Sequence, residues 1–111
     1  MKQGGILKAI IWHQGEADCS NPEAYKQKLI SLVKDLRADL ELPDLPVVVG
    51  QISQWNWTKR EAGTIPFNQM IKKVSSFIPN SDWVSSKGLG WYKDKTDPHF
   101  NTEAQLLLGK R

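Results

Sequence analysis

Residues 6–12 read Ile-Leu-Lys-Ala-Ile-Ile-Trp, and a polar stretch at 13–21 leads from them into Asn21-Pro22-Glu23. The first stretch is almost entirely apolar and rich in β-branched residues, which predicts a strand that is largely buried. Asn at the N-cap and Pro at the first helical position predict that a helix begins at Pro22. A buried strand followed by a helix is the repeating unit of a parallel α/β sheet.

Strands and amphipathic helices alternate through the rest of the chain. Thr102 and Gln105 fit a capping box at the start of the last helix, and Arg37 is expected on the polar face of the first helix. We expect a helix over 22–40 that stops before Pro43, a strand over 46–52, a helix over 67–78, a strand over 83–84 and a helix over 104–108. This order predicts a single three-layer α/β/α domain over 1–111, with three parallel strands and right-handed crossovers.

Composition excludes several classes of protein. The 111 residues allow one domain, and 40% hydrophobic with 24% charged residues is ordinary for a globular chain, not a coiled coil or a disordered tail. The charges sum to +3 but are interspersed, which argues against a nucleic-acid partner. No apolar run is long enough to span a membrane. No apolar core of a signal peptide follows Met1, so a cytoplasmic location is the default expectation. The sequence does not determine the compartment. The single cysteine, Cys19, cannot form an intrachain disulfide.

Function in open parallel sheets is carried by loops at the carboxyl ends of the strands. Those loops are 13–21, 54–64 and 86–101, and they hold both histidines and half of the aromatic residues. Gln14 offers an amide donor beside the carboxylate of Glu16, although the same segment also reads as an ordinary polar turn. His99 follows Asp97, and an imidazole oriented by a carboxylate is typical of a general base, although Asp-x-His also occurs by chance.

Four aromatic residues fall in the loops that would border such a site. They either stack on sugar rings or cover the sheet edge or an oligomer interface, where Trp is also enriched. They are Trp55, Trp57, Trp91 and Tyr92. Two histidines more than eighty residues apart do not define a metal site, and we expect neither a metal nor another cofactor.

Several segments together resemble the SGNH-hydrolase carbohydrate esterases of the sialate O-acetylesterase and acetylxylan esterase type. The most distinctive is Trp-His-Gln-Gly-Glu-Ala-Asp at 12–18. The others, in the same order and spacing, are Leu-Arg-Ala-Asp-Leu at 36–40, Leu-Pro-Val-Val at 45–48, Asp-Pro-His-Phe-Asn-Thr at 97–102, Gln105 and Leu-Gly-Lys-Arg at 108–111. The resemblance covers the whole chain and implies part of a flavodoxin-like sheet, corresponding to the C-terminal half of the family's domain.

The resemblance also implies roles for individual residues. His99 matches the histidine that deprotonates a serine nucleophile, and Gln14 matches the glutamine that lies where the oxyanion is stabilised. Asp97 and Glu16 match the two candidates for the carboxylate that orients the histidine. The family separates Asp and His by three positions, whereas Asp97 and His99 are two apart. This departure favours Glu16 as the orienting acid.

The Gly-Gln-Ser-Asn-like turn that carries the family's nucleophile has no counterpart in this sequence. The chain therefore resembles a carbohydrate O-acetyl esterase but is expected to be inactive alone. The alternative is a non-enzymatic module that binds carbohydrate or associates with itself. The family's central strand matches residues 6–12, and without its neighbours that strand would expose backbone groups beside an apolar face. We expect either a homo-oligomer or a complex with a complementary N-terminal fragment, with acetylated carbohydrate as the ligand.

Overall fold

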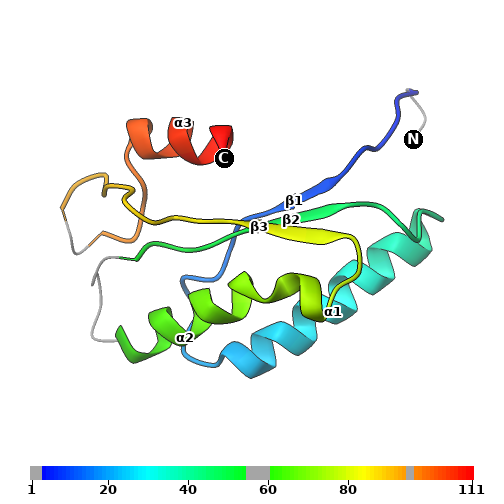
Figure 1. Cartoon of the computed structure of the whole chain (residues 1–111), viewed down its shortest axis with the longest axis horizontal. Coiled ribbons are helices and arrows are strands. Elements are labelled where there is room, and N and C mark those ends of the chain that lie inside the picture. Colours follow the sequence, from blue (N-terminus) through cyan, green and yellow to red (C-terminus); the bar gives the residue numbers. More distant parts are fainter. Residues whose placement is uncertain (1–3, 55–60, 95–96) are drawn as a thin grey trace.

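The computed structural model describes residues 4–54, 61–94 and 97–111. Within them, strands and helices alternate along the chain (Figure 1). The elements are β1 (Ile10–Trp12), α1 (Pro22–Asp39), β2 (Val47–Gly50), α2 (Glu61–Lys72), a 3₁₀ turn η1 (Val74–Ser76), β3 (Ser81–Val84) and α3 (Thr102–Lys110). The predicted α/β class is confirmed.

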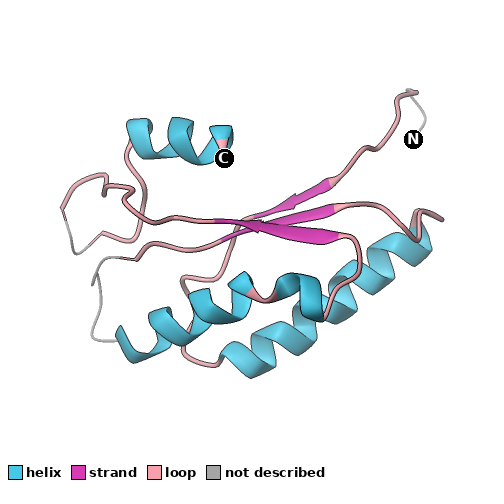
Figure 2. Ribbon diagram, in the orientation of Figure 1, coloured by secondary structure: helices cyan, strands magenta, loops and turns pink. Residues whose placement is uncertain are grey.

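The three strands form one parallel sheet in the order β1-β2-β3. Ile10 lies opposite Val47, and Val47 lies opposite Ser81. The connections from β1 to β2 and from β2 to β3 both step in the same direction across the sheet. Because such connections are right-handed, α1 and α2 lie on the same face of the sheet. α3 lies on the other face (Figure 2). The result is a three-layer arrangement that corresponds to part of a flavodoxin-like fold.

The main core lies between the sheet and the two helices α1 and α2. Val47 and Val49 of β2 point into it and are fully buried. The other buried members include Tyr25, Leu29 and Val33 of α1 and Phe67 and Ile71 of α2. A second, smaller cluster holds α3 and consists of Leu89, Phe100 and Ala104, with Leu108 packed against it. Of the helices described, none has the length and apolarity needed to cross a membrane.

The bounds of several elements differ from the prediction, including those of β1, α2 and α3. β1 covers only Ile10–Trp12 of the expected 6–12, because β2 begins at Val47 and the described residues 4–9 pair with no described strand. α2 begins at Glu61, earlier than expected, and its apolar stripe continues through η1. α3 begins at Thr102 instead of Ala104, and its N-cap is Asn101, whose side chain accepts a hydrogen bond from Ala104 N at 2.8 Å.

Arg37 was expected on the polar face of the first helix, and this expectation is wrong. The residue is buried in the last turn of α1. Its Nε and Nη2 donate to the carbonyl of Leu45 at 3.1 and 2.7 Å, and Nη2 also donates to the carbonyl of Pro79 at 2.7 Å. The guanidinium therefore satisfies carbonyls in the two turns that lead into β2 and β3, which the charge pattern of a single helix does not reveal.

Candidate active site

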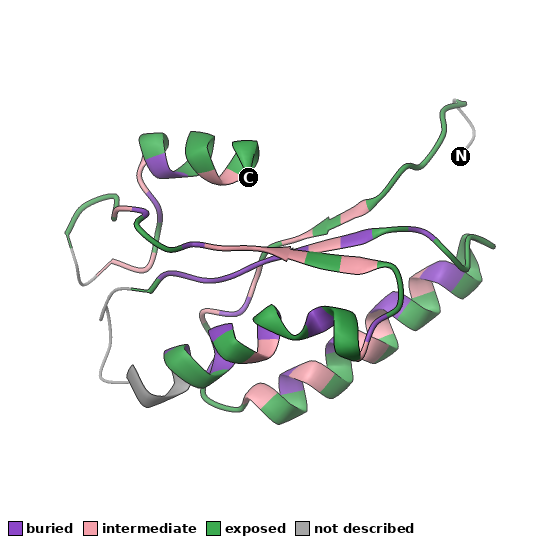
Figure 3. Cartoon of the chain, viewed as in Figure 1, coloured by how far each residue is buried: buried purple, intermediate pink, exposed green. Residues whose placement is uncertain are grey.

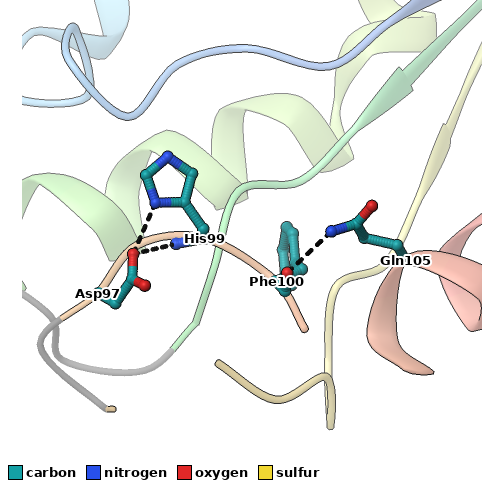
Figure 4. A network of polar contacts seen from close by, with 4 residues as sticks. All are labelled: Asp97, His99, Phe100 and Gln105. Carbon is teal, nitrogen blue, oxygen red and sulfur yellow. Dashed lines mark hydrogen bonds and ion pairs between the residues drawn. The ribbon is translucent and has the colours of Figure 1, made fainter. Parts of the chain in front are cut away.

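Asp97 and His99 are in direct contact in the loop before α3 (Figure 4). His99 Nδ1 lies 2.6 Å from Asp97 Oδ1, and the same oxygen accepts a hydrogen bond from the backbone N–H of His99 at 3.1 Å. The backbone bond and then the ring bond to His99 lower the pKa of the Asp97 carboxyl below its ordinary value. The carboxylate thus fixes both the ring and the backbone of the histidine.

The spacing of two residues explains this contact. An Asp side chain often bonds the backbone N–H two positions later, which closes an Asx turn. In that turn the imidazole of His99 lies beside the carboxylate of Asp97. Sequence spacing had favoured Glu16 as the orienting acid, whereas the structure places Asp97 against His99.

Two of the predicted aromatic residues lie beside His99. Trp91 pairs with Phe100 in an antiparallel bridge, and Tyr92 N donates to the carbonyl of His99 at 2.9 Å. Both side chains are exposed. The structure therefore brings Trp91 and Tyr92 to the segment that carries His99. The predictions for Trp55 and Trp57 lie outside the described residues.

Tyr25 of α1 supports the loop after β1 through hydrogen bonds of its hydroxyl group. The Tyr25 hydroxyl donates to the carbonyl of Gln14 at 3.0 Å and accepts a hydrogen bond from Trp12 Nε1 at 2.9 Å. Its ring packs edge-on against Phe67, with centroids 4.7 Å apart. Gly15 lies on the same Phe67 ring, so close that a Cβ there would be 2.2 Å from Cζ. Hydrophobic periodicity accounts for Tyr25 only as an apolar residue of the helix and gives no sign of this role of its hydroxyl.

His13 links the two loops of the site. Its Nε2 lies 2.9 Å from the carbonyl of Gln51, and its ring stacks on Phe100 at 5.6 Å between centroids. The ring passes over Gly50 at the end of β2, where a Cβ would lie 2.9 Å from His13 Cδ2. The sequence does not predict this contact between His13 and Phe100; it shows only that His13 belongs to the motif at 12–18.

A groove of about 660 Å³ runs between the carboxyl ends of the strands, α3 and the loop of His99. His99 and Glu16 both line it, and the His99 side chain is 79% exposed. Gln14 does not line this groove. Its Nε2 donates to Asp18 Oδ2 at 3.1 Å, in a separate depression beside α1. The structure thus brings Glu16 to the same groove as His99 and leaves the Gln14 amide outside it.

The described residues that line this groove carry no aliphatic hydroxyl or thiol group. Among the described residues that line it, none is a serine, threonine or cysteine. Ser53 and Ser86 are buried elsewhere, and Ser86 Oγ donates to the carbonyl of Ile52 at 2.6 Å. The part of the chain that the structure describes also holds no cluster of side chains suited to a metal ion.

The whole chain matches the family model described as carbohydrate esterase, sialic acid-specific acetylesterase, over residues 1–111. The chain belongs to this family of carbohydrate esterases. The motif at 12–18 and the pair Asp97–His99 both lie within the matched segment.

A curated relative of this chain is a probable carbohydrate esterase of Arabidopsis thaliana. It is 36% identical over 114 residues, which cover 97% of this chain and 39% of the relative. The X-ray structure of the same Arabidopsis protein at 1.6 Å resolution superposes with a TM-score of 0.72 at 32% identity, over 97% of this chain and 43% of that one. The chain thus spans about two fifths of the relative that it matches.

Proposed function

We propose that this chain supplies the general-base half of a carbohydrate O-acetyl esterase site. The observation that carries the proposal is the contact between His99 Nδ1 and Asp97 Oδ1 at 2.6 Å, on a side chain that opens into a groove. An imidazole held in this way has one nitrogen occupied by the carboxylate, which leaves Nε2 to take up a proton. Asp97 in this role orients the ring and stabilises the imidazolium that forms.

The reaction that this pair serves is transfer of an acetyl group from a sugar hydroxyl. As a serine oxygen bonds to the acetyl carbonyl carbon, its proton passes to His99 Nε2, and His99 then returns the proton to the departing sugar oxygen. Water repeats the sequence on the acetyl-serine and releases acetate. In this scheme Gln14 serves as a donor to the oxyanion, which requires its amide to leave Asp18, the present partner.

The chain alone is proposed to lack the attacking hydroxyl. The support is that His99 opens on a groove without a described serine, threonine or cysteine, and that the chain matches only 39% of its relative's length. A general base with no nucleophile to activate supplies no covalent step. We therefore expect the isolated chain to hydrolyse acetyl esters no faster than buffer.

Trp91 and Tyr92 are proposed to contact the sugar. Both rings are exposed on the segment hydrogen-bonded to that of His99, and sugar rings pack well on aromatic faces. The same exposed rings favour the second candidate, a non-enzymatic module that binds carbohydrate. Quenching of tryptophan fluorescence by acetylated sugars, lost in Trp91→Ala, together with no hydrolysis in any assembly would favour this second candidate.

The experiment measures release of 4-nitrophenol from 4-nitrophenyl acetate by two proteins. One is the 111-residue chain, and the other is the Arabidopsis relative with its matched segment replaced by this chain. We expect turnover only in the second protein. His99→Ala should abolish it, and Asp97→Asn should lower kcat by about 10²- to 10⁴-fold.

Glu16→Gln is the matched control, because Glu16 is a second carboxylate lining the same groove. A larger loss in Glu16→Gln than in Asp97→Asn would reverse the assignment of the orienting acid. His99-dependent turnover by the isolated chain would contradict its proposed inactivity. A folded but inactive chimera would contradict the esterase proposal itself.

A further inference from the structure

His13 lies where three segments meet at the carboxyl ends of β1 and β2. It directly follows β1, its Nε2 lies 2.9 Å from the carbonyl oxygen of Gln51, and its ring stacks on Phe100 in the loop before α3. A carbonyl oxygen accepts hydrogen bonds and cannot donate, so His13 Nε2 carries the proton of this bond. The hydrogen bond holds one edge of the imidazole at the end of β2, and the stack holds one of its faces.

Gly50, the last residue of β2, restricts the same ring. A Cβ at position 50 would lie 2.9 Å from Cδ2 and 3.3 Å from Cγ of His13. The φ of Gly50 is not in the left-handed region, so the backbone conformation does not itself require glycine here. Glycine at this position leaves the space in which the His13 ring lies.

Phe100 connects the His13 ring to His99, the preceding residue of the chain. The chain becomes buried at Phe100, just before it enters α3 (Figure 3). Phe100 also belongs to the small cluster with Leu89 and Ala104. Its ring therefore contacts both the imidazole at the strand ends and the cluster that holds α3.

Two backbone hydrogen bonds hold the chain on either side of Phe100. The N–H of Tyr92 donates to the carbonyl of His99 at 2.9 Å, and the N–H of Asn101 donates to the carbonyl of Gly90 at 3.0 Å. Both bonds fasten the segment of His99 to residues 90–92. The stack on His13 fastens the same segment to the ends of β1 and β2.

We propose that His13 is a positioning residue of the esterase site and sets where His99 stands relative to the strand ends. Asp97 orients the His99 ring within one loop, whereas His13 fixes the place of that loop through Phe100. A general base acts only within hydrogen-bond reach of the proton that it takes up. A displacement of about 1 Å can lower the rate on the order of 100-fold. This role rests on the proposed function, because it concerns the distance from His99 to the reacting ester.

The test uses the chimera in which this chain replaces the matched segment of the Arabidopsis relative. His13→Ala should lower kcat for 4-nitrophenyl acetate by about 10- to 100-fold. KM should stay within about threefold, because His13 positions the base and does not bind the ester. His13→Phe keeps an aromatic ring against Phe100, and it should retain kcat within about fivefold of the unsubstituted chimera.

Gly50→Ala tests the same connection without a change at His13. The added methyl group displaces the His13 ring and should lower kcat by at least about tenfold. Gly109→Ala in α3 is the matched control, because a Cβ at position 109 meets no atom within 4 Å. It should leave kcat unchanged. A rise in KM at unchanged kcat in His13→Ala, or equal effects of the two glycine substitutions, would overturn the proposal.

Hydrogen exchange in the 111-residue chain gives a readout that needs no turnover. In His13→Ala the amides of Tyr92 and Asn101 should exchange at least about tenfold faster, because the segment that they hold opens more often. The amide of Val47, which donates to the carbonyl of Asn80 in the sheet, should be accelerated much less.

Equal acceleration at all three amides would mean that His13 contributes only to general stability and would overturn the proposal. Unchanged exchange at Tyr92 and Asn101 would also overturn it. A chimera without turnover, combined with selective acceleration of these two amides, would contradict the proposed function and retain the positioning of the His99 segment by His13.

Discussion

The conformation of the loop after β1 requires glycine at position 15. Its φ is +147°, and a Cβ at this position would lie 2.2 Å from Cζ of Phe67. Phe67 of α2 is fully buried in the main core and packs against Tyr25, so its ring has little room to shift. We expect Gly15→Ala to lower the free energy of unfolding by about 2–3 kcal/mol, measured as a lower urea midpoint at unchanged slope.

Gly109 provides the control for this prediction. It lies in α3, and a Cβ there meets no atom within 4 Å. Gly109→Ala should stabilise the protein by about 0.5–1 kcal/mol, because alanine is the better helix former. Opposite signs for the two substitutions are expected, and a shared sign would contradict the close approach of Gly15 to Phe67.

Tyr25 predicts a dependence of stability on alkaline pH. Burial raises the pKa of its phenol above the ordinary value of 10.0, although the hydrogen bond from Trp12 partly offsets this. Since the pKa is higher in the folded state, Tyr25 contributes its full stability below pH 10.0 and loses it as the pH rises through the folded pKa. Tyr25→Phe should be less stable at neutral pH by about 1–3 kcal/mol.

The difference between wild type and Tyr25→Phe should shrink as the pH rises above 10.0. Denaturant midpoints of both proteins across that range measure it. A difference that stays constant over this pH range would mean that ionisation of the Tyr25 phenol does not affect stability.

Arg37 connects the end of α1 to the turns before β2 and β3 by hydrogen bonds. It donates to the carbonyls of Leu45 and Pro79 and is itself buried. We expect Arg37→Met to lower the free energy of unfolding by about 2–3 kcal/mol, because it leaves these carbonyls without a charged donor. Lys34→Met, an exposed cation on the same helix, should change the unfolding temperature little. Equal effects would contradict the role of the hydrogen bonds.

A polar network joins α2 to the ends of β2 and β3. Asn68 accepts a hydrogen bond from Ile52 N and donates to Ile52 O, while Gln51 donates to the carbonyl of Asn68 and accepts from Ser86 N. These buried bonds fix the strand ends from which the loops of the site depart. Hydrophobic periodicity predicts α2 but carries no information on such bonds.

In the molecule as a whole, the two sides of the sheet differ in how completely helices cover them. The side of α1 and α2 encloses the main core, whereas the side of α3 has a small cluster and exposes Ile11, Leu106 and Leu107. His99 lies on the less complete side, in a groove bordered by α3. The groove of the proposed site therefore opens on the less complete side of the sheet.

The sequence by itself determined the class of fold, the helix start at Asn21 and the family. Asn21 accepts from Ala24 N as its position before Pro22 predicted. Local periodicity and capping suffice for these features because each depends on residues a few positions apart. The motif at 12–18 and the residues around His99 carry the resemblance without knowledge of their contacts.

Only the tertiary structure decided the burial of Arg37, the hydroxyl contacts of Tyr25 and the link from His13 to Phe100. It also placed Asp97 instead of Glu16 against His99, and the Gln14 amide outside the groove of His99. The physical reason is that most of these contacts join residues distant in the chain, whose approach depends on how helices pack on the sheet. The Asx turn of Asp97 is local, but the competing position of Glu16 is set by the fold of the whole chain.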